Sequence, residues 1–430
     1  MPDSVPRTLD AMAAEAPACE LPTGNYWTIV WRQFRKNTPA MIGLAIILLL
    51  FAIAVFAPVL ANKYPYYWLT PDEGLTFPVL RALTNTDLVY LAALLAVLLI
   101  PLTWKILDLA GCDFWSLYPL RRAALLNIGL FALVLIGLPL FRHVPGRIFI
   151  DKTDLVDGQP FTYRVERDYR QEAAQRNDAS YLFAPVPWSP TDVPADSATG
   201  GRFGRPNATH PLGTDAIGQS VAARMIYAAR TSLAVGFISV GLSLIIGVVV
   251  GGVSGYFGGK VDLVLQRVVE MFICFPTFFL ILLIIAMYGA KLWLIMLAIG
   301  LVGWSGISRL TRAEILRVRT LDYVTAARAL GLSPLRIVLR HAVPNSLAPV
   351  LVSATFGIAG AVGTEAALSF LGLGDPNQPS WGGLMDGART VFSDKPILLI
   401  VPGLAIFLAI LAYNLVGEGL RDAIDPRLKV

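Results

Sequence analysis

Long apolar runs alternate with polar segments along the chain, and most of the runs have the length of a bilayer-crossing helix. A bilayer core about 30 Å thick is crossed by roughly 20 apolar residues in helical form. Eight runs meet or approach this length, near residues 40–61, 88–104, 124–141, 231–253, 264–288, 292–308, 347–370 and 397–416. The pattern therefore predicts an all-α polytopic membrane protein.

The polar segments between the runs define the expected organisation. It comprises an N-terminal segment 1–39, a first transmembrane helix 40–61, an insertion 62–141 with two candidate spans, a loop 142–230, a core 231–416 with five spans, and a tail 417–430. The two candidate spans of the insertion are the weakest, because each contains a proline, Pro101 or Pro139. The loop is polar and rich in Pro and Asp, so we expect little core there, with a small folded lobe as the alternative.

The distribution of Lys and Arg predicts the orientation in the membrane, because these residues favour the cytoplasmic side of short loops. The segment 309–346 is dense in Arg, and a basic cluster at 31–36 precedes the first run. The short loops on the opposite side carry few cations, namely Lys63, Arg81, Lys291, Arg389 and Lys395. We therefore expect both termini and 309–346 in the cytoplasm and 142–230 outside.

Composition agrees with lipid as the main solvent and excludes several classes of function. The 430 residues are 55% hydrophobic and 15% charged, whereas soluble domains carry about 25% charged residues. The net charge of +5 includes no Lys/Arg-rich block, so we expect no nucleic-acid partner. The three cysteines and three histidines lie far apart, so we expect neither a disulfide framework nor a metal site.

Catalytic and nucleotide-binding motifs do not appear in the sequence. A phosphate-binding loop reads Gly-x-x-x-x-Gly-Lys-Ser/Thr, and at Gly258-Gly259-Lys260 the flanking positions hold Ser254 and Val261 instead. We therefore expect no catalytic residues, no bound cofactor and no ATPase activity in this chain. A membrane enzyme would need clustered catalytic groups, and an ion-coupled transporter would work without an ATPase partner; both stand as alternatives.

Some residues inside the apolar runs carry expectations of their own. Glu270 and Glu365 lie within or at the edge of runs, where a carboxylate usually faces a partner or a cavity. They are candidates for an interface, or else for the translocation path, together with Pro276, which should kink its helix. Small residues repeat every four positions on one face of the run 231–253 and predict close helix packing: Gly247, Gly251 and Gly255.

The segment between the runs 292–308 and 347–370 has the local signals of a helix, a tight turn and a short second helix. Residues 313–330 contain no Gly or Pro, and Gly331 suits the left-handed position after a helix. Ser333 is a good N-cap and Pro334 a good first helical residue. The second helix should end near Ala342, because Pro344 disfavours helical backbone at the residue before it. Two spans need no such connection, so the segment is predicted to dock a partner, with an interfacial amphipathic linker as the alternative.

This segment resembles the EAA loop of bacterial ABC importer permeases. The matching positions hold, in order, Thr325, Ala326, Ala327, Gly331, Val343 and Pro344. Thr replaces the Glu that gives the loop its name, and Val replaces a Leu. The loss of the Glu removes any charged contact that it would make, while the turn is kept.

Other stretches resemble the second-permease branch of the dipeptide/oligopeptide/nickel permease family. They are Trp31–Asn37, His210–Asp215, Ala229–Leu233, Ala367–Gly374, Pro379–Gly382 and Asn414–Leu428. The resemblance covers roughly 26–62 and 207–430. The stretch 63–206 departs from it as a large insertion.

The resemblance implies a type I permease core of five spans plus an N-terminal span in the bacterial inner membrane, with two extra candidate spans in the insertion. It implies half of a translocation pathway for peptides or related small solutes. The expected partners are a homologous second permease, two cytoplasmic ATPase subunits that hold ATP-Mg, a periplasmic or lipid-anchored binding protein, and membrane lipid. Ser333 and Pro334 would join the six matched positions in the ATPase-coupling loop.

Overall fold

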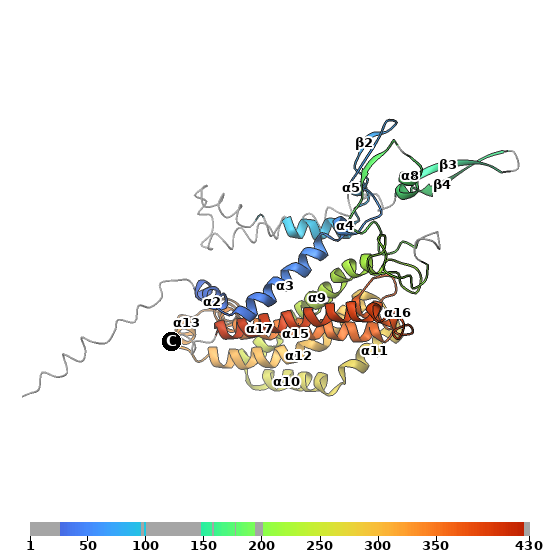
Figure 1. Ribbon diagram of the computed structural model, residues 1–430. Coiled ribbons are helices and arrows are strands. Elements are labelled where there is room, and N and C mark those ends of the chain that lie inside the picture. Colours follow the sequence, from blue (N-terminus) through green and yellow to red (C-terminus); the bar gives the residue numbers. More distant parts are fainter. Residues whose placement is uncertain are drawn as a thin grey trace, which may run out of the picture.

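The computed structural model describes residues 26–95, 99, 148–156, 159–176, 178–193 and 201–424. Its main body is a bundle of long helices (Figure 1): α3 (Thr38–Val55), α9 (Val221–Phe257), α10 (Gly259–Cys274), α11 (Thr277–Tyr288), α12 (Leu292–Val318), α15 (Val343–Phe370) and α17 (Ile397–Ile424). Five helices are long and apolar enough to cross a membrane, and the bent pair α10–α11 makes a sixth candidate. The structure therefore confirms the predicted core of five spans plus an N-terminal span.

The α9 and α12 helices make the most intimate contact of the bundle, and three glycines explain it. A Cβ atom added at Gly251 would lie only 2.4 Å from the carbonyl oxygen of Ser308. A Cβ added at Gly247 would lie 2.7 Å from the side chain of Ile307, and one added at Gly255 would lie 2.8 Å from the carbonyl oxygen of Arg312. Side chains at these positions would force the two backbones apart, so the predicted small-residue face is confirmed.

The bent span α10–α11 turns by 78° at a short break. Phe275 is extended (ψ 125°) and Pro276 precedes the first residue of α11. A proline lacks the N–H that would continue the helix and disfavours helical backbone at the residue before it. The predicted kink at Pro276 is therefore confirmed, in the form of a full break.

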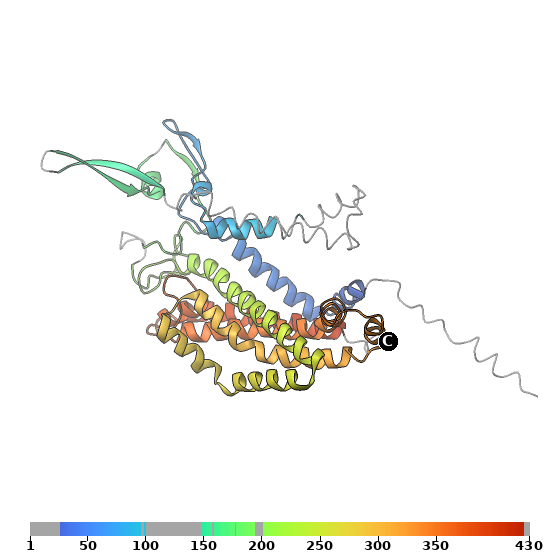
Figure 2. The same cartoon turned by 180° about the vertical axis from the view of Figure 1, so that it is seen from behind.

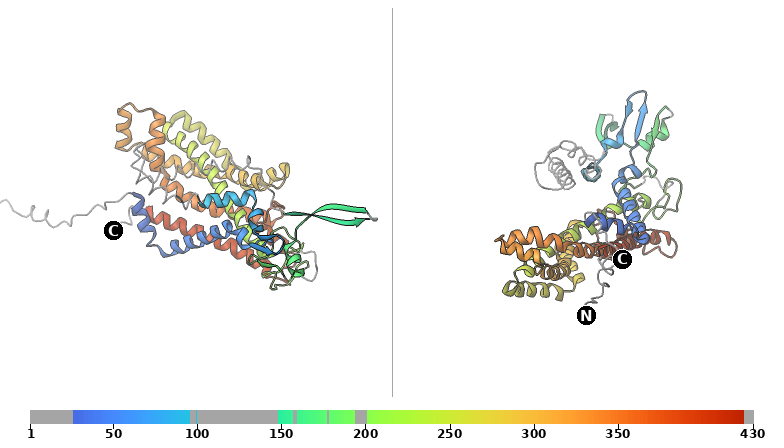
Figure 3. Two further views of the ribbon diagram at one scale, coloured as in Figure 1. Left: turned by 90° about the horizontal axis from the view of Figure 1, so that it is seen from above. Right: turned by 90° about the vertical axis from the view of Figure 1, so that its left-hand side faces the viewer.

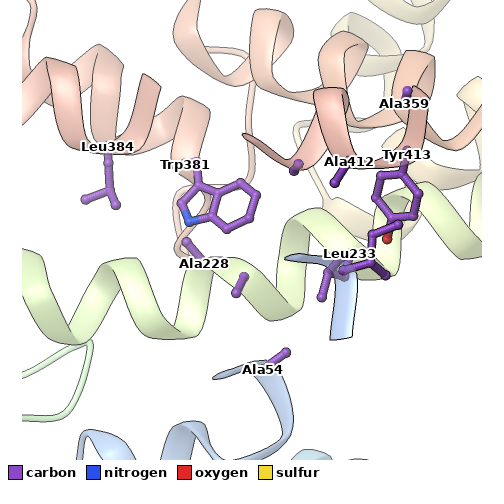
Figure 4. Packing of buried hydrophobic residues seen from close by; sticks show 11 residues of the cluster. Ala54, Ala228, Leu233, Ala359, Trp381, Leu384, Ala412 and Tyr413 are labelled. Atoms are coloured by element: carbon purple, nitrogen blue, oxygen red, sulfur yellow. The ribbon is translucent and has the colours of Figure 1, made fainter. Parts of the chain in front are cut away.

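The centre of the bundle is packed around two aromatic side chains (Figure 4). Trp381 lies in the short helix α16 (Trp381–Ala388), and its indole Nε1 donates to the carbonyl oxygen of Met225 at 3.3 Å. Tyr413 of α17 lies over Leu233 of α9 in the same cluster of buried side chains. This cluster joins α3, α9, α15, α16 and α17 into one core.

The N-terminal helices lie against the last helix of the chain. The α2 helix (Tyr26–Phe34) packs on α17 through Val30 and Phe34. Asn37 caps α3, since its side-chain oxygen accepts from the N–H of Ala40 at 3.1 Å, and its amide nitrogen donates to Asp422 at 3.3 Å. The stretch Trp31–Asn37 thereby holds the start of α3 to the end of α17.

A small lobe lies at the end of the bundle opposite α2 (Figures 1 and 2). Its elements are α4 (Ala57–Leu60), β1 (Tyr67–Thr70), β2 (Gly74–Thr76), α5 (Pro78–Arg81), β3 (Phe149–Val156), β4 (Gln159–Glu166), α8 (Tyr169–Gln175) and β5 (Ser180–Leu182). Strands β2, β1 and β5 form one antiparallel sheet, and β3 and β4 pair as a hairpin.

The lobe has a core, to which residues 142–230 contribute only together with residues 64–82. Tyr64, Trp68, Ala82 and Tyr169 are buried together. Burial raises the pKa of the Tyr64 hydroxyl, which donates to Glu166 at 2.8 Å. Aromatic residues separated by long stretches of sequence build this core, which is why composition alone did not reveal it.

Several boundaries from the sequence change. Helix α3 ends at Val55 rather than at residue 61, and α17 continues into the predicted tail as far as Ile424. Helix α9 begins at Val221 rather than near residue 231, because residues 221–230 contain no Gly or Pro and continue the helix beyond the apolar run. Of the two extra candidate spans, the structure describes an apolar helix Asn85–Leu95. The remainder of 88–104, apart from residue 99, and all of 124–141 lie outside the described residues.

Candidate functional site

The segment 309–346 lies at the end of the bundle away from the lobe, as Figure 1 and the view from above in Figure 3 show. Helix α12 extends through Val318, and Leu321 then adopts an extended conformation (ψ 147°) before α13 (Asp322–Ala329). The expectation of one helix over 313–330 is therefore wrong at 319–321. Asp322 stands in the first turn of α13, where a carboxylate favours a new helix start through the helix dipole.

The turn after α13 has the predicted geometry. Gly331 has φ +75°, the left-handed conformation that suits glycine. The N–H of Leu332 donates to the Ala327 carbonyl at 3.2 Å and that of Gly331 to the Arg328 carbonyl at 3.0 Å. These two bonds are the Schellman pattern that closes a helix C-terminus. The prediction that Gly331 takes the left-handed conformation after a helix is therefore confirmed.

The chain then enters α14 (Pro334–Ile337) with Pro334 as its first residue. Ser333 occupies the N-cap position in an extended conformation (ψ 145°), as predicted, but its side chain makes no capping hydrogen bond. The prediction that Pro334 is the first helical residue is thus confirmed, while the cap bond is absent.

The end of the segment differs from the prediction. Val343 is helical (φ −59°, ψ −49°), and its N–H donates to the carbonyl of Val338 across one π-helical turn, Val338–Ala342. The wider turn lets α14 run on into α15, and Pro344 lies in the first turn of α15. The expected helix end near Ala342 is therefore wrong.

One face of the segment is anchored by apolar packing. Val324 and Ala327 of α13 lie against Tyr256 at the end of α9 and against α12. The buried members of this cluster are Tyr256, Ile315, Val318, Val324, Ala327, Ile337, Val338 and Ala342. This packing fixes α13 and α14 in place without any partner chain.

The other face points away from the bundle and combines apolar and basic side chains; we call it the α13–α14 surface. Its large apolar members are unusually open, with Leu330, Leu335 and Leu339 at 83%, 67% and 62% exposure. Thr325, Ala326, Arg328, Arg336 and Arg340 are also exposed. Of the alanine pair, Ala326 faces outward and Ala327 inward. Exposed apolar side chains flanked by basic ones are typical of a surface that contacts a partner or lies at a membrane interface.

A polar network that no sequence motif predicted lies next to the start of the segment. The guanidinium of Arg312 donates to both carboxylate oxygens of Asp262 in α10, each at 2.6 Å. Ser254 of α9 donates to the same carboxylate. Arg319 donates to the Gly255 carbonyl at 3.1 Å. The network ties α9, α10 and α12 together where α13 begins.

The other candidate residues lie apart from the α13–α14 surface. Glu270 is exposed on α10 and pairs with Arg267 at 2.6 Å. Glu365 is buried in α15 and accepts from Ser369 at 2.6 Å. The two glutamates thus sit in different surroundings, one on the surface of the broken span and one within the α15 packing. Within the described residues, no group of three or more His, Cys, Asp or Glu could hold a metal ion.

The matched stretch His210–Asp215 forms an ordered connection between the lobe and α9. His210 is fully buried and stacks on Trp188, with ring centroids 4.5 Å apart. Asp215 pairs with Arg224 of α9 and accepts from the N–H groups of Ile217 and Gln219 at 3.0 and 2.9 Å. These contacts show a structural role for the stretch before α9.

These features define a polytopic membrane protein with the exposed α13–α14 surface at one end of its helix bundle. Residues 243–430 match the family described as the binding-protein-dependent transport system inner membrane component. Residues 25–76 match the N-terminal TM domain of oligopeptide transport permease C.

Two relatives agree with this family in sequence. The chain is 37% identical over 249 residues to the dipeptide transport system permease protein DppC of Alkalihalophilus pseudofirmus, covering 58% of this chain and 81% of that one. It is 36% identical to the glutathione transport system permease protein GsiD of Pectobacterium atrosepticum, covering 52% and 75%. A chain of the inward-facing MetNI methionine ABC transporter aligns with TM-score 0.38 and 19% identity, over 46% of this chain and 96% of that one. The chain belongs to the inner-membrane permease family of binding-protein-dependent ABC importers.

Proposed function

We propose that this permease forms half of a translocation pathway for peptides or related small solutes, and that residues 309–346 couple it to ATPase subunits. Relatives named for dipeptide, oligopeptide and glutathione transport support this substrate class. The partners are a homologous second permease, two ATPase subunits that bind ATP-Mg, and an external binding protein. This chain supplies neither a nucleotide site nor a cofactor.

The α13–α14 surface is the observation that carries the coupling proposal. Its inner face is buried on α9 and α12, and its outer face presents Leu330, Leu335 and Leu339 to water. Leaving such side chains exposed forgoes about 1.5–3 kcal/mol each relative to full burial. A groove on an ATPase that covers them recovers part of this free energy. The surrounding arginines extend the attraction to an acidic groove rim.

The proposal places this surface, with both termini, in the cytoplasm and the lobe on the external side. The Arg-dense segment supports this orientation through the preference of cations for the cytoplasmic face. Glu270, Pro276 and Glu365 remain candidates for the pathway or for the interface with the second permease. Pro276 is the strongest of the three, because it sets the bend of α10–α11.

Substitution at Gly331 tests the coupling role. A Cβ at this position meets nothing within 4 Å, so Gly331→Val changes the backbone preference and creates no clash. Holding a β-branched residue at φ +75° costs on the order of 1–3 kcal/mol locally. We expect normal membrane abundance, weakened ATPase co-purification and lost uptake. Gly331→Ala should show a milder form of the same defects.

Two companion variants sharpen the test. Leu330→Asp places a charge on a side chain that is 83% exposed, so it should leave the fold intact and abolish ATPase co-purification. Gly74→Val imposes a similar backbone strain in the lobe, at φ +68° with nothing within 4 Å of an added Cβ, so it should keep wild-type ATPase co-purification. Uptake of a labelled peptide and ATPase pull-down are measured at matched permease abundance. Wild-type values for both Gly331→Val and Leu330→Asp would refute the coupling role.

A further inference from the structure

A buried ion pair joins the insertion to the permease core. Arg230, in the outer part of α9, pairs with Asp87 of the helix Asn85–Leu95, and their side chains are only 8% and 4% exposed. The guanidinium also donates to the carbonyl oxygens of Ala54 and Val55 at the end of α3. One side chain of α9 therefore contacts both α3 and the insertion helix.

Aromatic rings enclose this arginine. The rings of Tyr90 and Tyr227 lie 4.9 and 5.2 Å from the guanidinium carbon. The Tyr90 hydroxyl also donates to the Arg230 carbonyl at 3.4 Å. A cation between two ring faces is attracted to both, and more strongly when water is excluded.

Asp87 has a second role at the start of its own helix. Its Oδ2 accepts from the N–H of Thr84 at 2.8 Å, and the Thr84 hydroxyl oxygen accepts from the N–H of Asp87 at 3.2 Å. This reciprocal pattern is a capping box with Asp in place of Glu. The other oxygen, Oδ1, accepts from Arg230. A single carboxylate thus starts the insertion helix and fixes that start to α9.

We propose that Arg230 and Asp87 are positioning residues that fix the insertion helix to α9, so that the two move as one body during transport. Removing either partner would leave the other charge buried and uncompensated, which is strongly destabilising. The pair is therefore kept through the transport cycle rather than opened and closed. Asp87 belongs to the insertion, whereas Arg230 lies in the stretch Ala229–Leu233 that resembles the family, so the pair joins a family-like position to the insertion.

The mechanical consequence follows from the length of α9. Its 37 residues span about 55 Å. Arg230 lies toward one end, and at the other end Gly255 contacts α12 just before α13. A displacement of α9 at the α13–α14 surface would carry the insertion helix with it. This step rests on the proposed coupling function, whereas the fixation itself does not.

The fixation can be measured without partners or transport. Spin labels at Leu95, at the end of the insertion helix, and at Ile217, just before α9, report the distance between the two elements in the full-length chain in nanodiscs. We expect one narrow distance distribution for the unmodified pair. Asp87→Asn and Arg230→Gln should each broaden it at least twofold, and Arg230→Lys should be intermediate because it keeps the charge but loses the two-carbonyl geometry. Asp72→Asn, which breaks the exposed Arg176–Asp72 pair, is the matched control and should change nothing.

Uptake by the assembled transporter is the second readout. We expect at least a tenfold loss in Asp87→Asn and Arg230→Gln, and wild-type uptake in Asp72→Asn. Narrow distributions in both single variants would overturn the fixation. Broad distributions with wild-type uptake would overturn the role in transport. An inactive unmodified transporter with a narrow distribution would count against the proposed function and leave the fixation standing.

Discussion

The α9–α12 contact allows a quantitative prediction at Gly251. A methyl group in Gly251→Ala would lie 2.4 Å from the Ser308 carbonyl oxygen, 2.8 Å from the Thr311 Cβ and 3.0 Å from the Arg312 nitrogen. Two of these atoms are backbone, so no side-chain rotation relieves the overlap, and the helices must separate. Overpacking of this kind typically costs about 1–3 kcal/mol.

The same helix offers a matched control. A Cβ at Gly241 meets nothing within 4 Å. Gly241→Ala therefore adds a methyl group in open space and removes a flexible residue from a helix interior, which favours folding by roughly 0.5–1 kcal/mol. The two substitutions are chemically identical, so the difference between them isolates the helix contact.

Unfolding by SDS titration in mixed micelles measures the free energy of unfolding of both variants. We expect Gly251→Ala to unfold at lower SDS than wild type, and Gly241→Ala at an equal or higher SDS fraction. Equal stability of the two variants would refute the reasoning, because the close approach at Gly251 would then carry no energetic weight. Thermal aggregation in detergent, followed at matched concentration, gives an independent ranking.

Two further predictions concern the end of the bundle that carries α13. The first uses Thr325→Cys in a background without the native cysteines. This single cysteine should react with a membrane-impermeant thiol reagent only after the cells are opened. Labelling of intact cells would reverse the proposed orientation. Asp262→Asn should keep the protein in the membrane and lower its free energy of unfolding by about 1–3 kcal/mol, because it weakens two charge-assisted bonds from Arg312; an unchanged unfolding midpoint would show that the pair contributes nothing there.

The features that the sequence revealed are those that depend on local chemistry. The length of the apolar runs predicts the membrane-spanning helices, and the spacing of Gly247, Gly251 and Gly255 predicts the face of α9 that packs on α12. The turn at Gly331 follows from one residue type at a helix end. Each of these is determined within a few residues, so no knowledge of the rest of the chain is required.

The features that were missed depend on contacts between distant residues. The lobe core joins Trp68 to Tyr169, and the Asp87–Arg230 pair spans a separation of 143 residues. One local signal was available, because Thr84 and Asp87 have the spacing of a capping box ahead of an apolar run. It marks the start of the helix, but the partner on α9 could not be deduced from it.

The two ends of segment 309–346 differ in helical continuity, and this has a consequence for the proposed coupling. Arg319–Leu321 interrupts the path from α12 to α13, whereas α14 continues through the π-helical turn into α15 with no break. A push on the α13–α14 surface would therefore be transmitted along α15 more directly than along α12. Glu365 and the contacts with α16 lie near the far end of α15. Under the proposed coupling, α15 is the element that carries motion from the ATPase side to the external side, and α12 follows through its glycine contact with α9.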